Sequence, residues 1–328
     1  MPGMTRHALI TGITGQDGGF LAARLLARGD RVTGTTRGDS VAAHAALPAD
    51  AAGASIITMD PSDATAIRTA IDTHAPDVVY HLAAPADPNI AWRTPSAAVD
   101  AIATGTARWL ETILELRPST RFVLAGSCQV FGPDSTAPQT ERTPYAPRHP
   151  YGAAKALAAF LVTSFREGRG LHASTALLYN HESGRRPGNY VTARICDAAV
   201  RIADEGPGAA PLELGTLTVV RDWGHAADHM AALVAMADAD VADDYVIGTG
   251  SGRTVTDFCA AAFGAVGLSW EAHVVSTAAL ARPGDVPALV ADPSRAARAL
   301  GWRATTSFDA LLAEMLDAAR ARRRTARP

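Results

Sequence analysis

The chain has 328 residues and a mass of 34.0 kDa, and 48% of its residues are hydrophobic while 19% are charged. This composition excludes a disordered, collagen-like or disulfide-scaffold protein, and the net charge of -3 offers no broad field for nucleic acid. The cysteines Cys128, Cys196 and Cys259 lie far apart and form no CxxC pair, so we expect no metal site. The sequence shows no secretory or membrane-spanning segment, which predicts a cytoplasmic protein.

The first half of the chain alternates short apolar runs with helical patterns. A strand at residues 7–11 enters a glycine turn, and from residue 20 to 28 apolar residues recur at helical spacing. Further strands are predicted at 31–36, 55–59, 77–82, 121–125 and 172–178, and helices at 64–73, 96–116 and 151–167. This order predicts an α/β protein of the Rossmann type, with a doubly wound parallel sheet of six or seven strands.

The second half predicts a smaller C-terminal α/β substrate-binding domain. Helices are predicted at 192–203, 226–237, 254–267 and 308–320, and strands near 212–220 and at 245–247, the last returning to the main sheet. The Rossmann domain would comprise residues 1–180 plus about 222–250, and the second domain about 181–221 and 251–328. The arginine-rich run after residue 320 is interpreted as a frayed, solvated tail.

Gly12, Gly15 and Gly18 follow the first predicted strand with GxxGxxG spacing and open the first helix. In this arrangement the first glycine permits a tight turn, the second lets the backbone approach a diphosphate, and the third lets helix and strand pack closely. The helix N-terminus then offers N–H donors to phosphate oxygens. The segment therefore predicts a dinucleotide-binding site.

The residues after the second predicted strand bear on the choice of dinucleotide. An NAD enzyme usually has a carboxylate there, whereas this chain has Arg37, whose guanidinium suits a 2′-phosphate. We therefore favour NADP as the cofactor. Asp39 would oppose a phosphate, which leaves NAD open, and Asp60 is a candidate partner for the adenine amino group or a plain helix cap.

Tyr151 and Lys155 lie about one turn apart on a predicted helix, so phenol and ammonium share a face. The ammonium favours the phenolate, which predicts that Lys155 lowers the pKa of Tyr151 and that the phenol acts as a base. Ser127, just after the predicted strand 121–125, would hold the substrate oxygen. Lys155 is the only lysine among 30 basic residues, which supports a chemical role for it.

The sequence resembles the extended short-chain dehydrogenase/reductase family, and within it the GDP-mannose 4,6-dehydratases. The resemblance rests on residues 8–18 (ALITGITGQDG), 150–155 (PYGAAK), 180–186 (NHESGRR) and 221–225 (RDWGH). It implies a nucleotide-sugar substrate, with a GDP-sugar expected, and a nicotinamide cofactor that is kept and recycled in turnover. It also implies a homodimer or homotetramer, with helices 96–116 and 151–167 at the dimer interface.

The resemblance assigns two sets of binding residues. Cofactor contacts are implied for Gly12, Gly15, Gln16, Asp17, Gly18, Arg37, Asp60, Leu82, Tyr151 and Lys155. Substrate contacts are implied for Ala86, Asn180, Asn189, Val191, Arg194, Arg221, Arg282 and Asp285. Arg194 stands where the family has a lysine, and Asp285 replaces a glutamate that touches the nucleoside. The arginines suit the oxygens of a diphosphate.

The chain departs from the family at the catalytic motif, where Gln129 stands in place of a glutamate. In the dehydratases that carboxylate takes the C5 proton before water leaves from C6, and an amide has no basic site for this step. The loop 84–88 also replaces a larger, hydroxyl-bearing segment, which leaves space for a rotating intermediate or a bigger sugar. We therefore expect a nucleotide-sugar 4-epimerase, in which Gln129 hydrogen-bonds the sugar or the cofactor.

Other interpretations stay open at this point. A 4,6-dehydratase could use a substitute base, for which Cys128 is the nearest candidate. A net oxidoreductase would consume free cofactor in stoichiometric amounts. A third alternative is a catalytically silent NADP-sensing or scaffold protein, which would have kept the fold without the enzyme activity. The guanine preference rests on the resemblance, so uridine or another nucleotide stays open as well.

Overall fold

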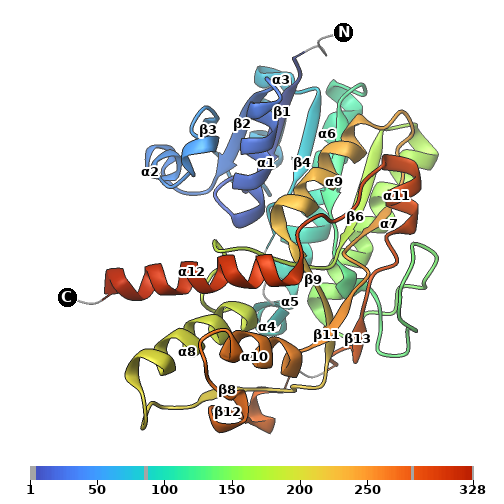
Figure 1. Cartoon of the computed structure of the whole chain (residues 1–328). Coiled ribbons are helices and arrows are strands. Elements are labelled where there is room, and N and C mark those ends of the chain that lie inside the picture. The colour runs from blue at the N-terminus through green and yellow to red at the C-terminus, as the bar shows by residue number, and fades with distance from the viewer. Residues whose placement is uncertain (1–4, 85–87, 282–283, 327–328) are drawn as a thin grey trace.

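The computed structural model describes residues 5–84, 88–281 and 284–326 (Figure 1). Within these residues the main sheet has seven parallel strands in the order β10-β6-β5-β4-β1-β2-β3. The strands are β1 (His7–Thr11), β2 (Arg31–Thr36), β3 (Ser55–Thr58), β4 (Val78–His81), β5 (Arg121–Ala125), β6 (Ala173–Leu178) and β10 (Tyr245–Ile247). The predicted Rossmann-type fold and its strand number are thereby confirmed.

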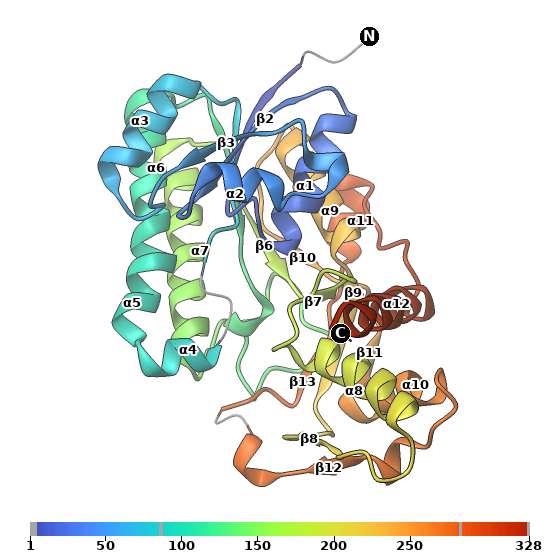
Figure 2. The same ribbon diagram turned by 90° about the vertical axis from the view of Figure 1, so that its left-hand side faces the viewer.

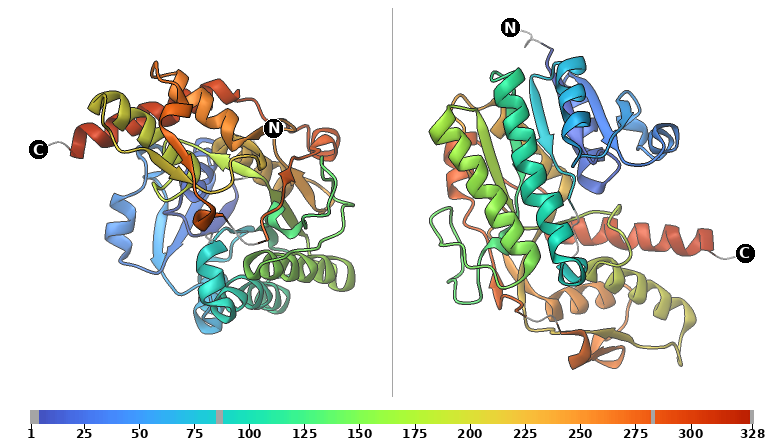
Figure 3. Two further views of the ribbon diagram at one scale, coloured as in Figure 1. Left: turned by 90° about the horizontal axis from the view of Figure 1, so that it is seen from below. Right: turned by 180° about the vertical axis from the view of Figure 1, so that it is seen from behind.

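Helices cover both faces of this sheet (Figure 2). One face packs against α1 (Gln16–Ala27), α9 (Ala226–Asp238) and α11 (Ser294–Leu300), and the other against α3 (Ala64–His74), α6 (Gly105–Leu116) and α7 (Pro150–Arg169). Alternation along the strands explains the two layers: Ile10 belongs to the first core and Leu9 to the second, and both are fully buried. Figure 3 shows α6 and α7 side by side from behind.

The predicted helix 96–116 consists of three consecutive segments. It begins as α5 (Pro95–Val99), widens to π-helical hydrogen bonding over η2 (Asp100–Thr104), and continues as α6. Other short helical segments are α2 (Ser40–Ala45), α4 (Pro88–Arg93), η1 (Ala49–Ala51), η3 (Cys128–Val130), η4 (Trp270–Ala272) and η5 (Ala278–Leu280).

The second lobe lies beyond the carboxyl ends of the strands (Figure 1). Its helices α8 (Val191–Glu205), α10 (Val255–Gly264) and α12 (Phe308–Ala326) share a core that includes Ile195, Phe258 and Leu312. Strand β9 (Val220–His225) pairs with β7 (Asn180–Glu182), β11 (Gly252–Thr254) and β13 (Ala288–Leu289), and β8 (Leu212–Leu214) pairs with β12 (Val274–Ser276). Since α11 packs on α9 and β10, the chain also returns to the first lobe late in the sequence.

Two sequence-based expectations about this lobe are wrong. The strand expected near 212–220 is two strands in different sheets, because the chain turns at Gly215, where a Cβ atom would come within 2.4 Å of the Leu280 carbonyl oxygen. The basic run after residue 320 is the end of helix α12 and not a frayed tail. Arg322 pairs with Asp197 and Arg323 with Asp204, so acidic residues of α8 hold it in place.

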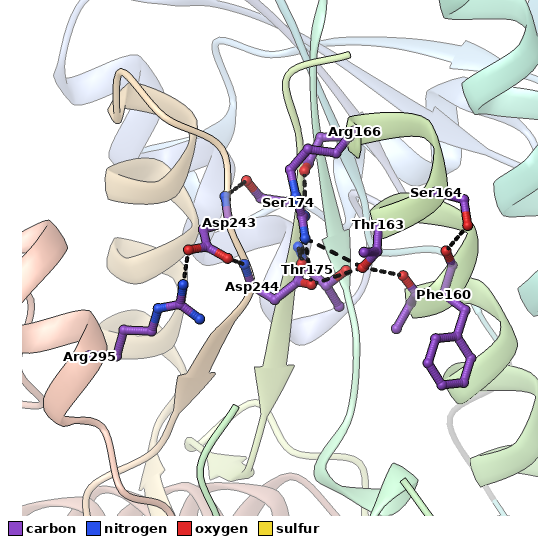
Figure 4. A network of polar contacts seen from close by, with 11 residues as sticks. Phe160, Thr163, Ser164, Arg166, Ser174, Thr175, Asp243, Asp244 and Arg295 are labelled. Carbon is purple, nitrogen blue, oxygen red and sulfur yellow. Dashed lines mark hydrogen bonds and ion pairs between the residues drawn. The ribbon is translucent and has the colours of Figure 1, made fainter. Parts of the chain in front are cut away.

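A polar network fastens the edge of the main sheet where β10 joins it (Figure 4). The two terminal nitrogens of the Arg166 guanidinium each donate to a different oxygen of Asp244, both at 2.9 Å. The same carboxylate accepts from the backbone N–H of Thr175 at 2.8 Å and from the Thr163 hydroxyl at 3.1 Å. Helix α7, strand β6 and the start of β10 are therefore held by one carboxylate.

Candidate active site

One cavity lies at the carboxyl ends of the central strands, where parallel α/β sheets bind ligands. Its lining combines the first turn of α1, the segments after β4 and β5, the start of α7 and the segment from the end of β6 to α8. Of the residues predicted for the site, it brings together Asp17, Leu82, Ser127, Gln129, Tyr151, Lys155, Asn180, Asn189 and Val191. Residues far apart in the sequence thus share one space.

The glycine turn between β1 and α1 has the shape that a diphosphate requires. Gly12 has a φ of +74°, which L side chains rarely adopt, and a Cβ atom on Gly18 would come within 2.5 Å of the Gly12 carbonyl oxygen. Gly15 caps α1 without any side-chain hydrogen bond, so the first N–H groups of the helix stay open to an anion. These residues fit the diphosphate of a dinucleotide.

The segment after β2 carries the residues expected to choose between NAD and NADP. The Asp39 carboxylate accepts a hydrogen bond from the Ala42 N–H at 2.8 Å and thereby caps α2. Asp60 accepts two hydrogen bonds from Ser62, which lower its pKa, and the nearby positive charge of Arg37 lowers it further. Asp60 is therefore held by Ser62, while the Asp39 carboxylate is engaged by its own helix.

Gln16 and Asp17 join the glycine turn to the segment that follows β6. The Gln16 amide donates to the His181 carbonyl oxygen at 3.2 Å and accepts from the Ser183 hydroxyl at 2.7 Å. Asp17 Oδ2 lies 2.9 Å from His181 Nε2. His181 also stacks on His229, with ring centroids 4.8 Å apart. The first turn of α1 is therefore tied to the start of the second lobe.

Ser127, Tyr151 and Lys155 meet at the centre of the cavity, and all three are buried. Lys155 Nζ donates to the Ala125 carbonyl oxygen at 2.6 Å and lies 5.9 Å from the centroid of the Tyr151 ring. Burial raises the pKa of Tyr151 above its ordinary value, and a hydrogen bond with Ser127 opposes this rise only in part. The net shift is opposite to the lowering that we predict from Lys155, because the phenol is enclosed while the ammonium faces a carbonyl.

Burial also lowers the pKa of Lys155 to about 8. Desolvation disfavours the ammonium, and the negative charge of Asp17 compensates in part. The ammonium therefore loses its proton at a pH close to the physiological range, unlike an exposed lysine.

Gln129 lies beside this triad in the short helix η3, and its partner is a residue that the sequence analysis missed. The Gln129 side-chain oxygen lies 2.9 Å from His149 Nε2, and His149 caps helix α7. The position of His149 directly before Pro150 and Tyr151, at the expected start of a helix, is the one sequence signal that could have identified it.

The residues predicted to bind substrate fall into two groups. Asn180, Asn189 and Val191 line the cavity, and Asn180 Oδ1 is buried without a hydrogen-bond partner among the described residues. Arg221 and Asp285 form an ion pair with each other at 2.5 Å, and half-buried Arg194 donates to the Glu213 carbonyl oxygen at 2.7 Å. Ala86 and Arg282, which were also predicted, lie outside the described residues.

The fold and this constellation define an enzyme of the extended short-chain dehydrogenase/reductase type, a nucleotide-sugar epimerase/dehydratase. The family model for GDP-mannose 4,6 dehydratase matches residues 9–315. The chain is 37% identical to GDP-mannose 4,6 dehydratase 2 of Arabidopsis thaliana over 322 residues, covering 94% of this chain and 86% of the relative. The human GDP-mannose 4,6 dehydratase is 34% identical over 341 residues, with 95% and 90% covered. The chain belongs to the GDP-mannose 4,6-dehydratase family.

Solved structures agree on the fold. The UDP-glucose 4-epimerase of Thermotoga maritima, solved with UDP-glucose, superposes with a TM-score of 0.84 at 22% identity, covering 97% of this chain and 99% of the other. The UDP-glucose 4-epimerase of Thermus thermophilus, solved with NAD, gives a TM-score of 0.81 at 22% identity, with 96% and 99% covered.

The described residues contain neither a cluster that could hold a metal ion nor a helix that could cross a membrane. Three or more His, Cys, Asp or Glu side chains do not gather anywhere in this part of the chain in a way that could hold a metal ion. The helices described here also include none that is long and apolar enough to span a membrane.

Proposed function

We propose that the protein is an NADP-dependent 4-epimerase of a nucleotide sugar, and of a GDP-sugar in particular. The observation that carries this proposal is that Gln129 lines the same cavity as Ser127, Tyr151 and Lys155. The cavity holds Ser127, Tyr151 and Lys155, which would serve the proton transfers of oxidation and reduction at C4 by a nicotinamide cofactor, beside an amide that cannot abstract a proton.

The residues would act as follows. Tyr151, as the phenolate, would take the proton of the O4 hydroxyl while Ser127 holds that oxygen, and Lys155 Nζ, 5.9 Å from the centroid of the Tyr151 ring, would place a positive charge near it. A nicotinamide cofactor held at the glycine turn supplies the acceptor for the C4 hydride and its later donor. The 4-keto sugar turns over, hydride returns to the opposite face of C4, and Tyr151 gives its proton back to O4. The product has the mass of the substrate.

The assignment of NADP rests on Arg37 and Asp39. The Asp39 carboxylate accepts a hydrogen bond from the Ala42 N–H, which holds it at the start of α2 while its negative charge remains. Arg37 offers a guanidinium for the 2′-phosphate. Denaturing the purified protein and identifying the released nucleotide tests this assignment, and release of NAD would overturn it.

Family membership favours a second candidate, 4,6-dehydration. That reaction needs a base other than Gln129, and the nearest candidate was Cys128. Burial raises the pKa of the Cys128 thiol to about 12, so the thiolate it would need is scarce at neutral pH. This group therefore does not fit the role of the substitute base.

The test of the proposed function is incubation of the purified protein with GDP-mannose and other GDP-sugars, followed by mass spectrometry and proton NMR. We expect unchanged mass and an altered coupling at C4. A product lighter by one water would establish dehydration instead.

We also propose that the protein assembles as a homo-oligomer built on a dimer. Large apolar side chains are exposed on the adjacent helices α4, α5 and α7, namely Ile90, Trp92, Val99, Leu157 and Phe160. Pairing of two copies across this face would remove all of them from water, which favours association. The expected tetramer would need a second surface.

A further inference from the structure

We propose that His149 is a positioning residue that turns the amide N–H₂ group of Gln129 toward the sugar. The site would then present a hydrogen-bond donor, suited to a hydroxyl or carbonyl oxygen of the bound sugar. The inference rests on the proposed function in that it requires the sugar to occupy the cavity beside Tyr151.

The backbone N–H of Gly152, in the first turn of α7, determines the tautomer of His149. This group can only donate, and it lies 3.0 Å from His149 Nδ1. Nδ1 must therefore accept, which leaves the proton of a neutral imidazole on Nε2. The tautomer of His149 follows from a main-chain donor and not from an assigned hydrogen position.

The tautomer of His149 in turn orients the side-chain amide of Gln129. His149 Nε2 lies 2.9 Å from the Gln129 side-chain oxygen, and because Nε2 carries a proton it must face an acceptor. The amide oxygen is thus the atom held by His149, and the N–H₂ group is left for other partners. Since Gln129 lines the cavity beside Ser127 and Tyr151, those donors are available to a bound sugar.

The backbone geometry around Gly152 brings the two side chains together. A Cβ atom at position 152 would lie 2.3 Å from the main-chain carbonyl oxygen of Gln129, so only glycine lets η3 pack this closely on α7. His149 is itself only 8% exposed and stacks parallel to the Tyr151 ring, with centroids 6.2 Å apart. The imidazole is therefore enclosed by the first turn of α7, the Gln129 amide and the Tyr151 ring. It would act on the sugar only by orienting Gln129.

A first test requires no substrate. Long-range proton–nitrogen NMR of labelled protein at neutral pH should show His149 as the Nε2–H tautomer, with His149→Asn identifying its signals. The Nδ1–H tautomer or an imidazolium would overturn the inference. Because this readout is independent of turnover, it separates failure of the inference from failure of the proposed function.

A second test is a double-mutant cycle with GDP-mannose as the probe. His149→Asn keeps a side chain that caps helices well but is too short to hold Gln129. We expect it to lower kcat/KM about tenfold, Gln129→Ala to lower it at least as much, and the double variant to be no worse than Gln129→Ala alone. Unchanged thermal unfolding of His149→Asn would exclude a merely structural effect. Additive losses would show that His149 acts independently of Gln129 and would overturn the inference.

Discussion

Asp17 and His181 form an ion pair across the two lobes, with Oδ2 and Nε2 2.9 Å apart. Their side chains are only 28% and 13% exposed. Burial disfavours both charges. Nevertheless, the positive charge of His181 and its hydrogen bond hold the pKa of Asp17 well below its usual range, and the negative charge of Asp17 raises the pKa of His181. The pair therefore links the first turn of α1 to the second lobe in a pH-dependent way.

We predict that Asp17→Asn destabilises the protein most at mildly acidic pH. The pKa of His181 is raised above 6.5 in the folded state. The stabilisation that its positive charge gives is therefore fully present below pH 6.5, the pKa in the unfolded chain, and is lost as the pH rises through the pKa in the folded protein. The loss in free energy of unfolding should be about 2 kcal/mol near pH 5.5 and clearly smaller near pH 8.5. Urea unfolding at both values measures it. Glu205→Gln, at an exposed pair, should show a small effect at both, and a pH-independent loss in Asp17→Asn would contradict the assignment.

Replacing the catalytic phenol separates chemistry from binding. Tyr151→Phe removes the group that exchanges the O4 proton, so kcat on the GDP-sugar substrate should fall by about a thousandfold while the Kd of that substrate changes little. Steady-state kinetics and calorimetry provide the two numbers. Tyr145→Phe is a matched control, because Tyr145 packs on Phe131 and Phe160 away from the cavity. Equal activity of both variants would remove Tyr151 from the mechanism.

A change at Gln129 tests the proposal that the amide at this position prevents elimination. Gln129→Glu places a carboxylate beside the triad, and we expect it to produce a sugar nucleotide lighter by one water from GDP-mannose. Gln129→Asn, which adds no base, should not. Mass spectrometry of the products decides between them. If the unchanged protein already releases water, the base is another group and the epimerase proposal is wrong.

Much of this site could be predicted from the sequence, because it depends on local patterns. Strand 31–36 is rich in β-branched residues, strand 121–125 is an apolar run, and the spacing of Tyr151 and Lys155 sets one helix face. The roles of His149 and His181 could not be predicted, since their partners Gln129 and Asp17 reach them only through tertiary packing. The pKa of Tyr151 was mispredicted for the same reason, because burial depends on the whole fold.

The apolar face on α4, α5 and α7 predicts the oligomeric state. Phe160 is 57% exposed there, so Phe160→Asp should shift the protein toward the monomer by placing a charge in the proposed interface. Sedimentation at micromolar concentration measures the change. Val241→Asp is the control, since Val241 is 74% exposed but lies in the turn before β10. A monomeric unchanged protein would refute the dimer.

We predict that the loss of the Asp244 carboxylate lowers the free energy of unfolding more than the loss of an exposed carboxylate nearby. Asp244→Asn leaves the Arg166 guanidinium, only 15% exposed, without its counter-charge and disturbs the hydrogen bonds to Thr163 and Thr175 (Figure 4). We expect a loss of about 3 kcal/mol in the free energy of unfolding. Asp240→Asn, an exposed change in the same turn, should cost less than about 0.5 kcal/mol. Urea unfolding monitored by circular dichroism compares the two, and equal midpoints would mean that the network adds nothing to the stability of this sheet edge.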